Sequence, residues 1–334
     1  MAFNQSNLQE IMKENEEILC AYSQYLNLFP RFITAEMVQD LAKECRISTH
    51  EAFLNLFTAA CGLDTSLASH RKLERTYIRA GVTPLDPDLY ATDTYCQTVR
   101  FPKKKLGKWE LCYRDYAPYE PFASGDPILC ADHREIPRIG YFEAPFSFPA
   151  VLENGVEWMT VTPNEIETMK SPIQNATGRV LTLGLGLGYF VFHVAQKPDV
   201  TSVTVVERDA DVISLFQKFL LPSFPCQQKI HIIQADGIEY LEKEEIAKAY
   251  DSIFADIWHD PSDGLALYLK LKRIERKRSL PRMDYWIESS LLSALRRMVW
   301  ERMQDPNSAL QLTGIRESEL LSDAFLRRLA EGIS

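Results

Sequence analysis

Three glycines at alternate positions follow a short apolar run and precede a helix-like segment. The run is residues 180–183, and the glycines are Gly184, Gly186 and Gly188. Glycines at such a turn let the backbone bend tightly and lie against a ligand, because they have no Cβ, and the turn directs helix N–H groups at the ligand. A dinucleotide site favours Gly-x-Gly-x-x-Gly, but Tyr189 stands at its third glycine position. The pattern therefore favours a nucleoside ligand of another kind.

Acidic residues end the next two apolar runs of the chain. Glu207 follows the run 203–206, about twenty residues past the glycines, and Asp236 and Gly237 come soon after the run 230–233. In a sheet of parallel strands such positions face the crevice in which an adenosine ribose lies. A carboxylate at Glu207 can accept hydrogen bonds from both ribose hydroxyls. Asp236 can accept a hydrogen bond from an adenine amino group.

A cluster of reactive side chains follows the fourth apolar run, and its members are Asp256, Trp258, His259, Asp260 and Asp263. Substrates bind at this place in open α/β sheets. Asp256 or His259 is the best-placed base, and an imidazole titrates near neutral pH. Trp258 can wall the cavity and lie against a cationic or planar acceptor. Asp260 and Asp263 lie farther out and are expected to meet a polar or cationic acceptor, with Asp260 counted among the catalytic candidates.

The elements that position these residues form a predicted parallel sheet. The first three runs are separated by helix-length segments, which indicates crossover helices. The fourth run is 253–255, and a weaker fifth run lies at 285–287. Beyond it, residues 291–303 and 317–329 have only helical texture. The fold class is therefore α/β, with a Rossmann-like sheet shortened to about five strands.

The N-terminal part is predicted to be helical. Residues 7–79 show helical periodicity, and Ser48 or Thr49 is expected to cap the second helix of a helix–turn–helix pair. Such a pair invites a DNA-binding interpretation. However, residues 50–61, where a recognition helix would lie, contain no Lys or Arg. We therefore expect this part to serve helical packing or dimerisation.

The middle part is predicted to be a small antiparallel β region. Residues 93–163 alternate turn formers with aromatic residues, and Asn154-Gly155 between apolar runs predicts a hairpin. We expect this region to lie over the carboxyl ends of the parallel strands and to help form the acceptor pocket.

The predicted organisation has three parts. They are a helical domain at 1–92, a hairpin-rich covering segment at 93–175, and a Rossmann-like domain with C-terminal helices at 176–334.

The amino-acid composition limits the classes of partner that the protein is expected to bind. The 46 acidic and 37 basic residues give a net charge of −9, whereas nucleic-acid affinity comes largely from Lys and Arg that neutralise phosphates. No stretch approaches the ~20 apolar residues of a membrane span, and no signal-peptide pattern is present. The seven cysteines include no Cys-x-x-Cys, which argues against a disulfide framework or zinc site. We therefore expect a cytoplasmic protein with a small-molecule acceptor, no nucleic-acid or membrane partner, and any homodimer formed through the N-terminal parts.

With these motifs in place, the sequence resembles the class I S-adenosylmethionine-dependent methyltransferases. Over residues 153–264 it resembles more closely their relatives, the spermidine synthase-like aminopropyltransferases. Residues 154–165 resemble the family's hairpin and acidic turn, and residues 183–188 stand where its glycine-rich loop stands. Residues 250–261, with Asp256 among them, are similar to its catalytic loop. The resemblance implies that an adenosyl sulfonium compound binds through the glycines, Glu207, Asp236 and Gly237.

The chain also departs from that family. The family's glycine loop carries an aspartate in the region where this chain has Leu187. Its Tyr–His pair after the acidic turn is absent, and Glu167, Thr168 and Met169 follow instead. Residues 256–260 also resemble the metal-bearing loop of catechol-type O-methyltransferases. Only Glu288 stands where the second acidic pair of that family would lie, so no metal site is predicted.

These observations favour a transferase that uses S-adenosylmethionine to methylate a small-molecule acceptor. The alternatives are aminopropyl transfer from decarboxylated S-adenosylmethionine and a non-catalytic relative that keeps only nucleotide binding. An NAD(P)-dependent oxidoreductase is disfavoured by the glycine spacing. The sequence leaves open the acceptor, the oligomeric state and any use of a divalent metal.

Overall fold

The computed structural model describes residues 5–305 and 316–332. The chain forms two compact units, each built from three separate stretches. The first unit takes in Met1–Pro87, Asp115–Ser147 and Arg296–Ser322; the second takes in Asp88–Arg114, Phe148–Leu295 and Asp323–Ser334. The three-part organisation predicted above (1–92, 93–175 and 176–334) stays a prediction.

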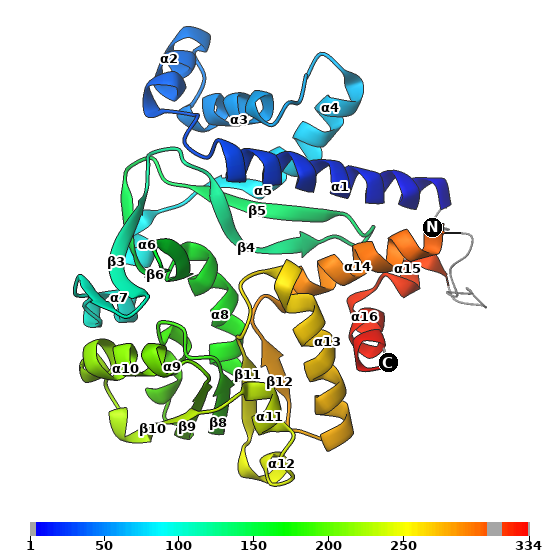
Figure 1. The fold of residues 1–334 in the computed structure, drawn as a ribbon. Coiled ribbons are helices and arrows are strands. Elements are labelled where there is room, and N and C mark those ends of the chain that lie inside the picture. Colours follow the sequence, from blue (N-terminus) through cyan, green and yellow to red (C-terminus); the bar gives the residue numbers. More distant parts are fainter. Residues whose placement is uncertain (1–4, 306–315, 333–334) are drawn as a thin grey trace. The chain divides into compact units, whose positions relative to one another are not determined.

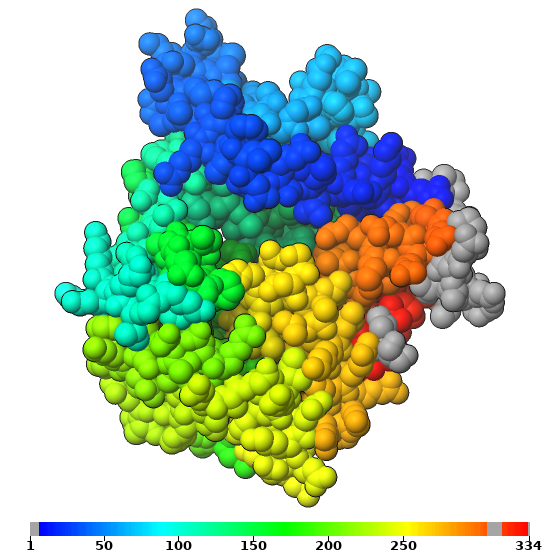
Figure 2. All heavy atoms as spheres, in the orientation of Figure 1, coloured from blue at the N-terminus to red at the C-terminus, as the bar shows by residue number. Residues whose placement is uncertain are grey.

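The first unit begins with the predicted helices. They are α1 (Gln5–Leu28), α2 (Ala35–Cys45), α3 (Thr49–Ala60), α4 (Ala68–Leu73), η1 (Glu74–Ile78) and α5 (Arg79–Gly81). Ser48 caps α3 as expected, since its Oγ accepts a hydrogen bond from the backbone N–H of Glu51. Helices α2 and α4 belong to two lobes of this unit that stand apart on its surface (Figure 2).

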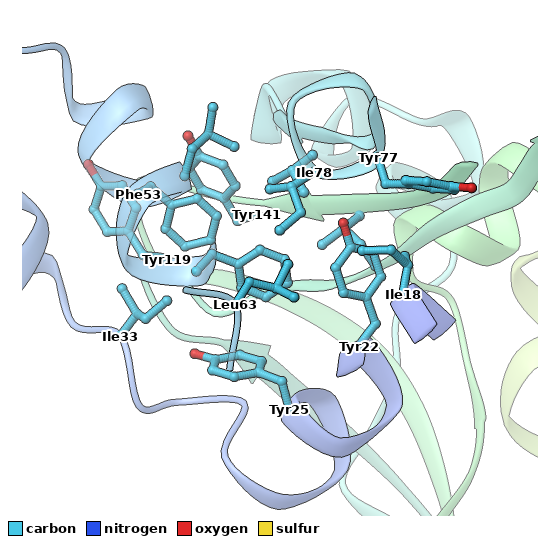
Figure 3. Close-up of a cluster of buried hydrophobic side chains, with 14 of the residues drawn as sticks. Ile18, Tyr22, Tyr25, Ile33, Phe53, Leu63, Tyr77, Ile78, Tyr119 and Tyr141 are labelled. Carbon is cyan, nitrogen blue, oxygen red and sulfur yellow. The ribbon is translucent and has the colours of Figure 1, made fainter. Parts of the chain in front are cut away.

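A three-stranded sheet and an aromatic core complete the first unit. The strands are β1 (Val82–Pro84), β4 (Phe122–Leu129) and β5 (Glu135–Tyr141), in the order β1-β5-β4, and α1 packs along β5 (Figure 1). Strand β1 was not predicted, because three residues are too few to show periodicity. The rings of Phe53, Tyr119 and Tyr141 contact one another in the core, with centroids 3.9 to 5.9 Å apart (Figure 3). Burial of such rings, together with the aliphatic side chains of the same core, stabilises this unit.

The second unit contains the predicted parallel sheet. Its strands are β8 (Gly178–Leu183), β9 (Val200–Glu207), β10 (Ile230–Gln234), β11 (Ser252–Ala255) and β12 (Met283–Tyr285). Their order is β10-β9-β8-β11-β12 and all neighbours are parallel (Figure 1). The α/β class and the five-stranded Rossmann-like sheet are thereby confirmed for the described part of the chain. The last strand begins two residues earlier than the apolar run indicated.

Helices connect and cover these strands. They are α6 (Pro87–Ala91), α7 (Thr94–Thr98), α8 (Pro163–Asn175), α9 (Tyr189–Ala195), α10 (Ala210–Leu215), η2 (Phe216–Leu220), η3 (Leu221–Ser223), η4 (Gln227–Lys229), α11 (Gly237–Leu241), α12 (Ile246–Ala249), α13 (Pro261–Arg278), α14 (Glu288–Gln304), α15 (Glu317–Leu320) and α16 (Asp323–Gly332). Of these, α15 and the second half of α14 belong to the first unit. Each described helix is too short or too polar to cross a lipid bilayer.

A four-stranded antiparallel sheet forms part of the predicted β region, whereas β4 and β5, which also lie within residues 93–163, belong to the sheet of the first unit. Its strands are β2 (Lys104–Leu106), β3 (Trp109–Tyr116), β6 (Phe146–Glu153) and β7 (Val156–Thr160), in the order β2-β3-β6-β7. Asn154 and Gly155 form the two-residue turn between β6 and β7, with φ values of 51° and 85°. Two positive φ angles identify the tight hairpin turn that Asn-Gly favours.

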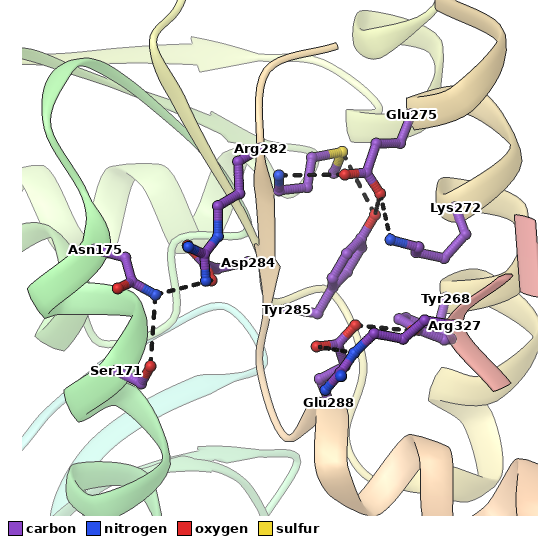
Figure 4. Close-up of polar contacts among 11 residues, drawn as sticks. Ser171, Asn175, Tyr268, Lys272, Glu275, Arg282, Asp284, Tyr285, Glu288 and Arg327 are labelled. Atoms are coloured by element: carbon purple, nitrogen blue, oxygen red, sulfur yellow. Dashed lines mark hydrogen bonds and ion pairs between the residues drawn. The ribbon is translucent and has the colours of Figure 1, made fainter. Parts of the chain in front are cut away.

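Polar contacts hold β12 against the neighbouring helices of the second unit (Figure 4). The Tyr285 hydroxyl donates to Glu275 at 2.9 Å, and the Glu288 carboxylate accepts from Tyr268 at 2.8 Å and contacts Arg327 at 3.4 Å. Glu288 stands where a metal-binding acidic pair was considered, and both of its oxygens take part in these contacts. Strand β12 and helices α13, α14 and α16 are thereby joined at one place.

Candidate active site

A cavity of about 310 Å³ lies in the second unit at the carboxyl ends of the parallel strands. Nine of the residues selected from the sequence line it: Gly184, Gly186, Glu207, Asp236, Gly237, Asp256, Trp258, His259 and Asp263. The fold brings them together because the carboxyl ends of parallel strands meet at one edge of the sheet. Gly188 and Asp260 lie outside the lining. The roles predicted for all eleven residues stay predictions.

The three glycines differ in what a side chain would meet. A Cβ on Gly184 would overlap the Asp256 carbonyl, and one on Gly188 would lie 2.5 Å from the Phe216 ring. Close packing therefore explains these two glycines. Gly186 has φ +53° and nothing within 4 Å of its Cβ position. At Gly186 the backbone thus faces open cavity, which fits a ligand that approaches the glycine loop closely.

Glu207 is fixed at the end of β9 by backbone donors. Its Oε2 accepts from the Leu185 N–H at 3.2 Å, and its Oε1 accepts from the Asp209 N–H at 2.8 Å. The carboxylate therefore ties the glycine loop to the second strand. A carboxylate oxygen has two lone pairs, so each oxygen can still accept a ribose hydroxyl.

Asp236 caps the short helix α11. Its Oδ1 accepts from the N–H groups of Ile238 and Glu239 at 2.9 and 3.0 Å. These bonds hold the carboxylate at the cavity wall beside Gly237. The capping role explains why an acidic residue stands here, and the adenine contact predicted for it stays a prediction.

Asp256 lies beside the glycine loop. Strand β11 pairs with β8, and the Asp256 N–H donates to the Leu183 carbonyl at 2.9 Å. Burial of the carboxyl group, together with the negative charge of Glu207, raises the pKa of Asp256 to about 7. Burial also raises the pKa of Glu165, and the charges of Asp256 and Glu157 add to the effect. A carboxyl group that titrates near neutral pH is suited to exchange a proton with a substrate.

Asp260 and Asp263 form the start of helix α13. Asp260 Oδ1 accepts from the Ser262 N–H at 2.6 Å, and Asp263 Oδ1 accepts from the His259 and Asp260 N–H groups at 3.1 and 3.0 Å. This is a capping box with Pro261 in the first turn. The pattern Asp-Pro-Ser-Asp is a recognisable sequence signal for it. Both acidic side chains thus have a structural reason to be present.

Trp258 and His259 differ in exposure although they are neighbours. Trp258 is buried, with its ring stacked near Tyr285. His259 is exposed, and its ring centroid lies 3.9 Å from that of Trp158 in a T-shaped contact. The imidazole therefore lies at the rim of the cavity, where an acceptor could reach it.

The antiparallel sheet contributes a second wall of the cavity. The residues of this wall were not among the site residues predicted from the sequence. Lys108, Trp109, Glu153 and Trp158 line the cavity with Met159. Lys108 Nζ pairs with Glu153 at 2.5 Å, and Trp109 and Trp158 meet edge to face at 5.9 Å. These residues of the β region lie beside the strand ends, and the role predicted for the region in covering a substrate stays a prediction. The hairpin at Asn154 was the sequence signal that placed Trp158 here.

Residues 166–273 match the family model of the spermine/spermidine synthase domain. The matched segment is roughly a third of the chain and contains the glycine loop, Glu207, Asp236 and Asp256. The resemblance to this family predicted from the sequence is confirmed over that segment. Lys108, Trp109 and Trp158 lie outside it.

The solved structures that are similar to part of this chain include two spermidine synthases. The spermidine synthase from Thermotoga maritima is 18% identical, with a TM-score of 0.32 over 46% of this chain and 55% of that one. A spermidine synthase in complex with the transition state analogue AdoDATO is 20% identical, with a TM-score of 0.34 over 46% of this chain and 57% of that one. The chain thus spans little more than half the length of these structures. No curated protein matches it.

Proposed function

We propose that this chain transfers an aminopropyl group from decarboxylated S-adenosylmethionine to an amine acceptor. The family match over residues 166–273 supports this reaction over methylation. The observation that carries the proposal is the position of Asp256, an acidic group with a pKa raised to about 7 in a cavity next to the glycine loop.

The lining residues fit an adenosine-bearing donor. Gly186 would let the backbone contact the nucleoside, Glu207 would accept the ribose hydroxyls, and Asp236 would face the adenine. When bound, the donor supplies a carbon made electrophilic by the adjacent sulfonium.

Charge favours the decarboxylated donor. Asp256 lies within electrostatic reach of both Glu207 and Glu165. A carboxylate bound among these acidic groups would raise their pKa values further, whereas a cation would favour their ionised forms. S-adenosylmethionine carries a carboxylate on its methionine part, whereas the decarboxylated compound carries only an ammonium there. An amine acceptor also fits this environment.

Asp256 is the base in the proposed reaction. The acceptor nitrogen forms a new C–N bond while the C–S bond of the donor breaks and methylthioadenosine leaves. The nitrogen then loses a proton, and the Asp256 carboxylate takes it. His259, at the rim, is the alternative proton acceptor.

Methyl transfer from S-adenosylmethionine is the second candidate. The Tyr–His pair that the aminopropyltransferase family uses for its amine is absent here, and Glu167, Thr168 and Met169 follow the acidic turn instead. The Thr168 hydroxyl accepts from Trp286 Nε1 at 3.0 Å, so it packs against the protein. A different acceptor could occupy the space that the family's amine takes.

The test offers both donors separately, each with a mixture of 1,4-diaminobutane, phenols and carboxylates. Mass spectrometry then measures the released nucleosides, and calorimetry measures binding of methylthioadenosine and NAD. Methylthioadenosine formed from the decarboxylated donor and the diamine supports the proposal. S-adenosylhomocysteine formed from S-adenosylmethionine supports methyl transfer instead. Binding of NAD without binding of methylthioadenosine contradicts both candidates.

A further inference from the structure

A buried tyrosine contacts the glycine loop from outside the segment that matches the family model. Tyr95, on helix α7, is fully buried, and its hydroxyl donates to the Leu187 carbonyl at 2.6 Å. Leu187 lies between Gly186, which faces the open cavity, and Gly188, which packs against Phe216. The Tyr95 side chain thus reaches the turn that would contact the nucleoside.

The same turn is held on its other side. The Gly188 N–H donates to the Leu185 carbonyl at 2.9 Å. The peptide group between Leu187 and Gly188 is therefore bonded at both its oxygen and its nitrogen. Since a peptide group is planar, these two bonds fix its orientation. The Leu185 carbonyl belongs to the peptide group before Gly186, so the same bond also restricts the backbone of Gly186.

Asp93 adds a second attachment one turn further on. Its Oδ2 accepts from the Tyr189 hydroxyl at 3.0 Å, and its Oδ1 accepts from the Tyr95 N–H at 2.8 Å and lies 3.4 Å from His193 Nε2. Burial alone would raise the pKa of Asp93. The interaction with His193 opposes this effect of burial, and the hydrogen bonds from the Tyr189 hydroxyl and the Tyr95 amide add to it. Together they hold the pKa of Asp93 below its ordinary value. The group is therefore a half-buried carboxylate bonded to helix α9.

Ring contacts make this attachment rigid. The Tyr95 ring meets those of Tyr189 and Phe192 edge to face, with centroids 5.3 and 5.2 Å apart. It also meets Phe224 at 6.1 Å. Phe224 is one of the two rings that a side chain at position 188 would strike. The tyrosine, the glycine loop and the start of α9 are thus packed as one body.

We propose that Asp93 and Tyr95 form a clamp that holds the glycine loop in the conformation that binds the nucleoside. Both are positioning residues, since they act through Leu187 and Tyr189 and do not line the cavity. The ligand class rests on the proposed function. The clamp predicts that donor affinity depends on a hydroxyl group outside the cavity.

The test substitutes Tyr95→Phe, which removes the hydroxyl and keeps the ring. Calorimetry with methylthioadenosine is expected to show affinity weaker by about tenfold, the cost of leaving one buried carbonyl without its donor. The KM for the donor rises while kcat at saturation is unchanged. Hydrogen exchange at the amides of residues 185–190 becomes faster in the ligand-free protein, because the loop opens more often.

Tyr77→Phe is the matched control. Tyr77 is a buried tyrosine of the first unit, and its hydroxyl donates to Asn15 Oδ1 at 2.9 Å. This substitution should lower the melting temperature and leave both the affinity and the exchange of residues 185–190 unchanged.

Affinity and loop exchange equal in Tyr95→Phe and the control would overturn the clamp, as would faster exchange with unaltered affinity. If methylthioadenosine fails to bind the unsubstituted chain, the proposed function is contradicted. The exchange comparison then decides alone whether Tyr95 holds the loop.

Discussion

Strand β11 has an aspartate next to each of its ends, and the two carboxyl groups lie in opposite environments. Asp251, before the strand, is exposed and accepts from the Arg179 side chain at 3.0 Å and from its N–H at 2.8 Å, so its pKa falls to about 2. Asp256, after the strand, is surrounded by protein and other acids, and its pKa rises to about 7. The same residue type is thus a permanent anion at one edge of the sheet and a titrating group at the other.

Two glycines of strand β8 and its loop repeat this contrast. Gly178 has φ +67°, and a Cβ on it would lie 2.5 Å from the Asp251 carboxylate. Gly186 also has a positive φ, but nothing lies within 4 Å of its Cβ position. The amino-end edge is therefore filled by protein, whereas the carboxyl-end edge leaves space. Residue type alone does not separate the two edges, but packing does.

The largest expected effect comes from Asp256→Asn. If Asp256 takes the acceptor's proton, this substitution lowers turnover by at least about 100-fold. Asp251→Asn is the matched control, since it removes an aspartate from the other end of the same strand and should leave turnover unchanged. Both rates are measured as methylthioadenosine released at saturating donor. Equal rates in the two variants would remove Asp256 from the mechanism.

The next effect is a dependence of turnover on pH. Only the ionised carboxylate can accept a proton, so kcat should rise with pH and level off above about 7, the pKa of Asp256. Stability changes in the opposite sense. Because the pKa is raised from 3.8, the folded chain binds this proton more tightly than the unfolded chain, and stabilisation present at low pH is lost as pH rises to about 7. The free energy of unfolding of Asp256→Asn, measured with urea at several pH values, should not fall in this way. A fall of the same size in the variant would show that another group causes it.

The smallest expected effect compares Gly186→Ala with Gly178→Ala. Both residues have positive φ, so each substitution costs about 1–2 kcal/mol of folding free energy. Gly178→Ala costs more than this, because its methyl group would also meet the Asp251 carboxylate. Only Gly186→Ala also places a methyl group in the open cavity, and it should weaken methylthioadenosine binding by about tenfold. Calorimetry on both variants measures the difference. Equal affinities would show that the ligand does not lie against Gly186.

The sequence predicted the parallel strands and the hairpin because their signals are local. Alternation, helix-length spacing and the Asn154-Gly155 pair each involve a few neighbouring residues. The wall formed by Lys108 and Trp109 could not be predicted, since it depends on how β3 pairs with β6. The capping box at Asp260 is visible in the sequence as the pattern Asp-Pro-Ser-Asp. This pattern predicts a structural role for Asp260 at the start of a helix.

The environment of Asp256 was beyond the reach of a single sequence. Its position after the fourth strand was clear, and its pairing partner β8 was expected from the order of strands in such sheets. The nearness of Glu165 was not, because it depends on where helix α8 lies relative to the strand ends. Burial and neighbouring charges set the pKa of Asp256, and neither is a property of the residues next to it in the chain.

The interleaving of the two units has a consequence for how the chain folds. Strand β1 pairs with β5 more than fifty residues later, and Arg296 reaches Glu135 across 161 positions to form a buried ion pair. Contacts between residues so far apart in sequence form slowly, because the entropy of closing a long loop is lost before the favourable energy of the contact is gained. On the ribosome, the first unit must wait for residues 296–322 before its last stretch can dock. During synthesis the part of this unit around Glu135 therefore stays uncovered until Arg296 has been made, and a chaperone would meet it in that interval.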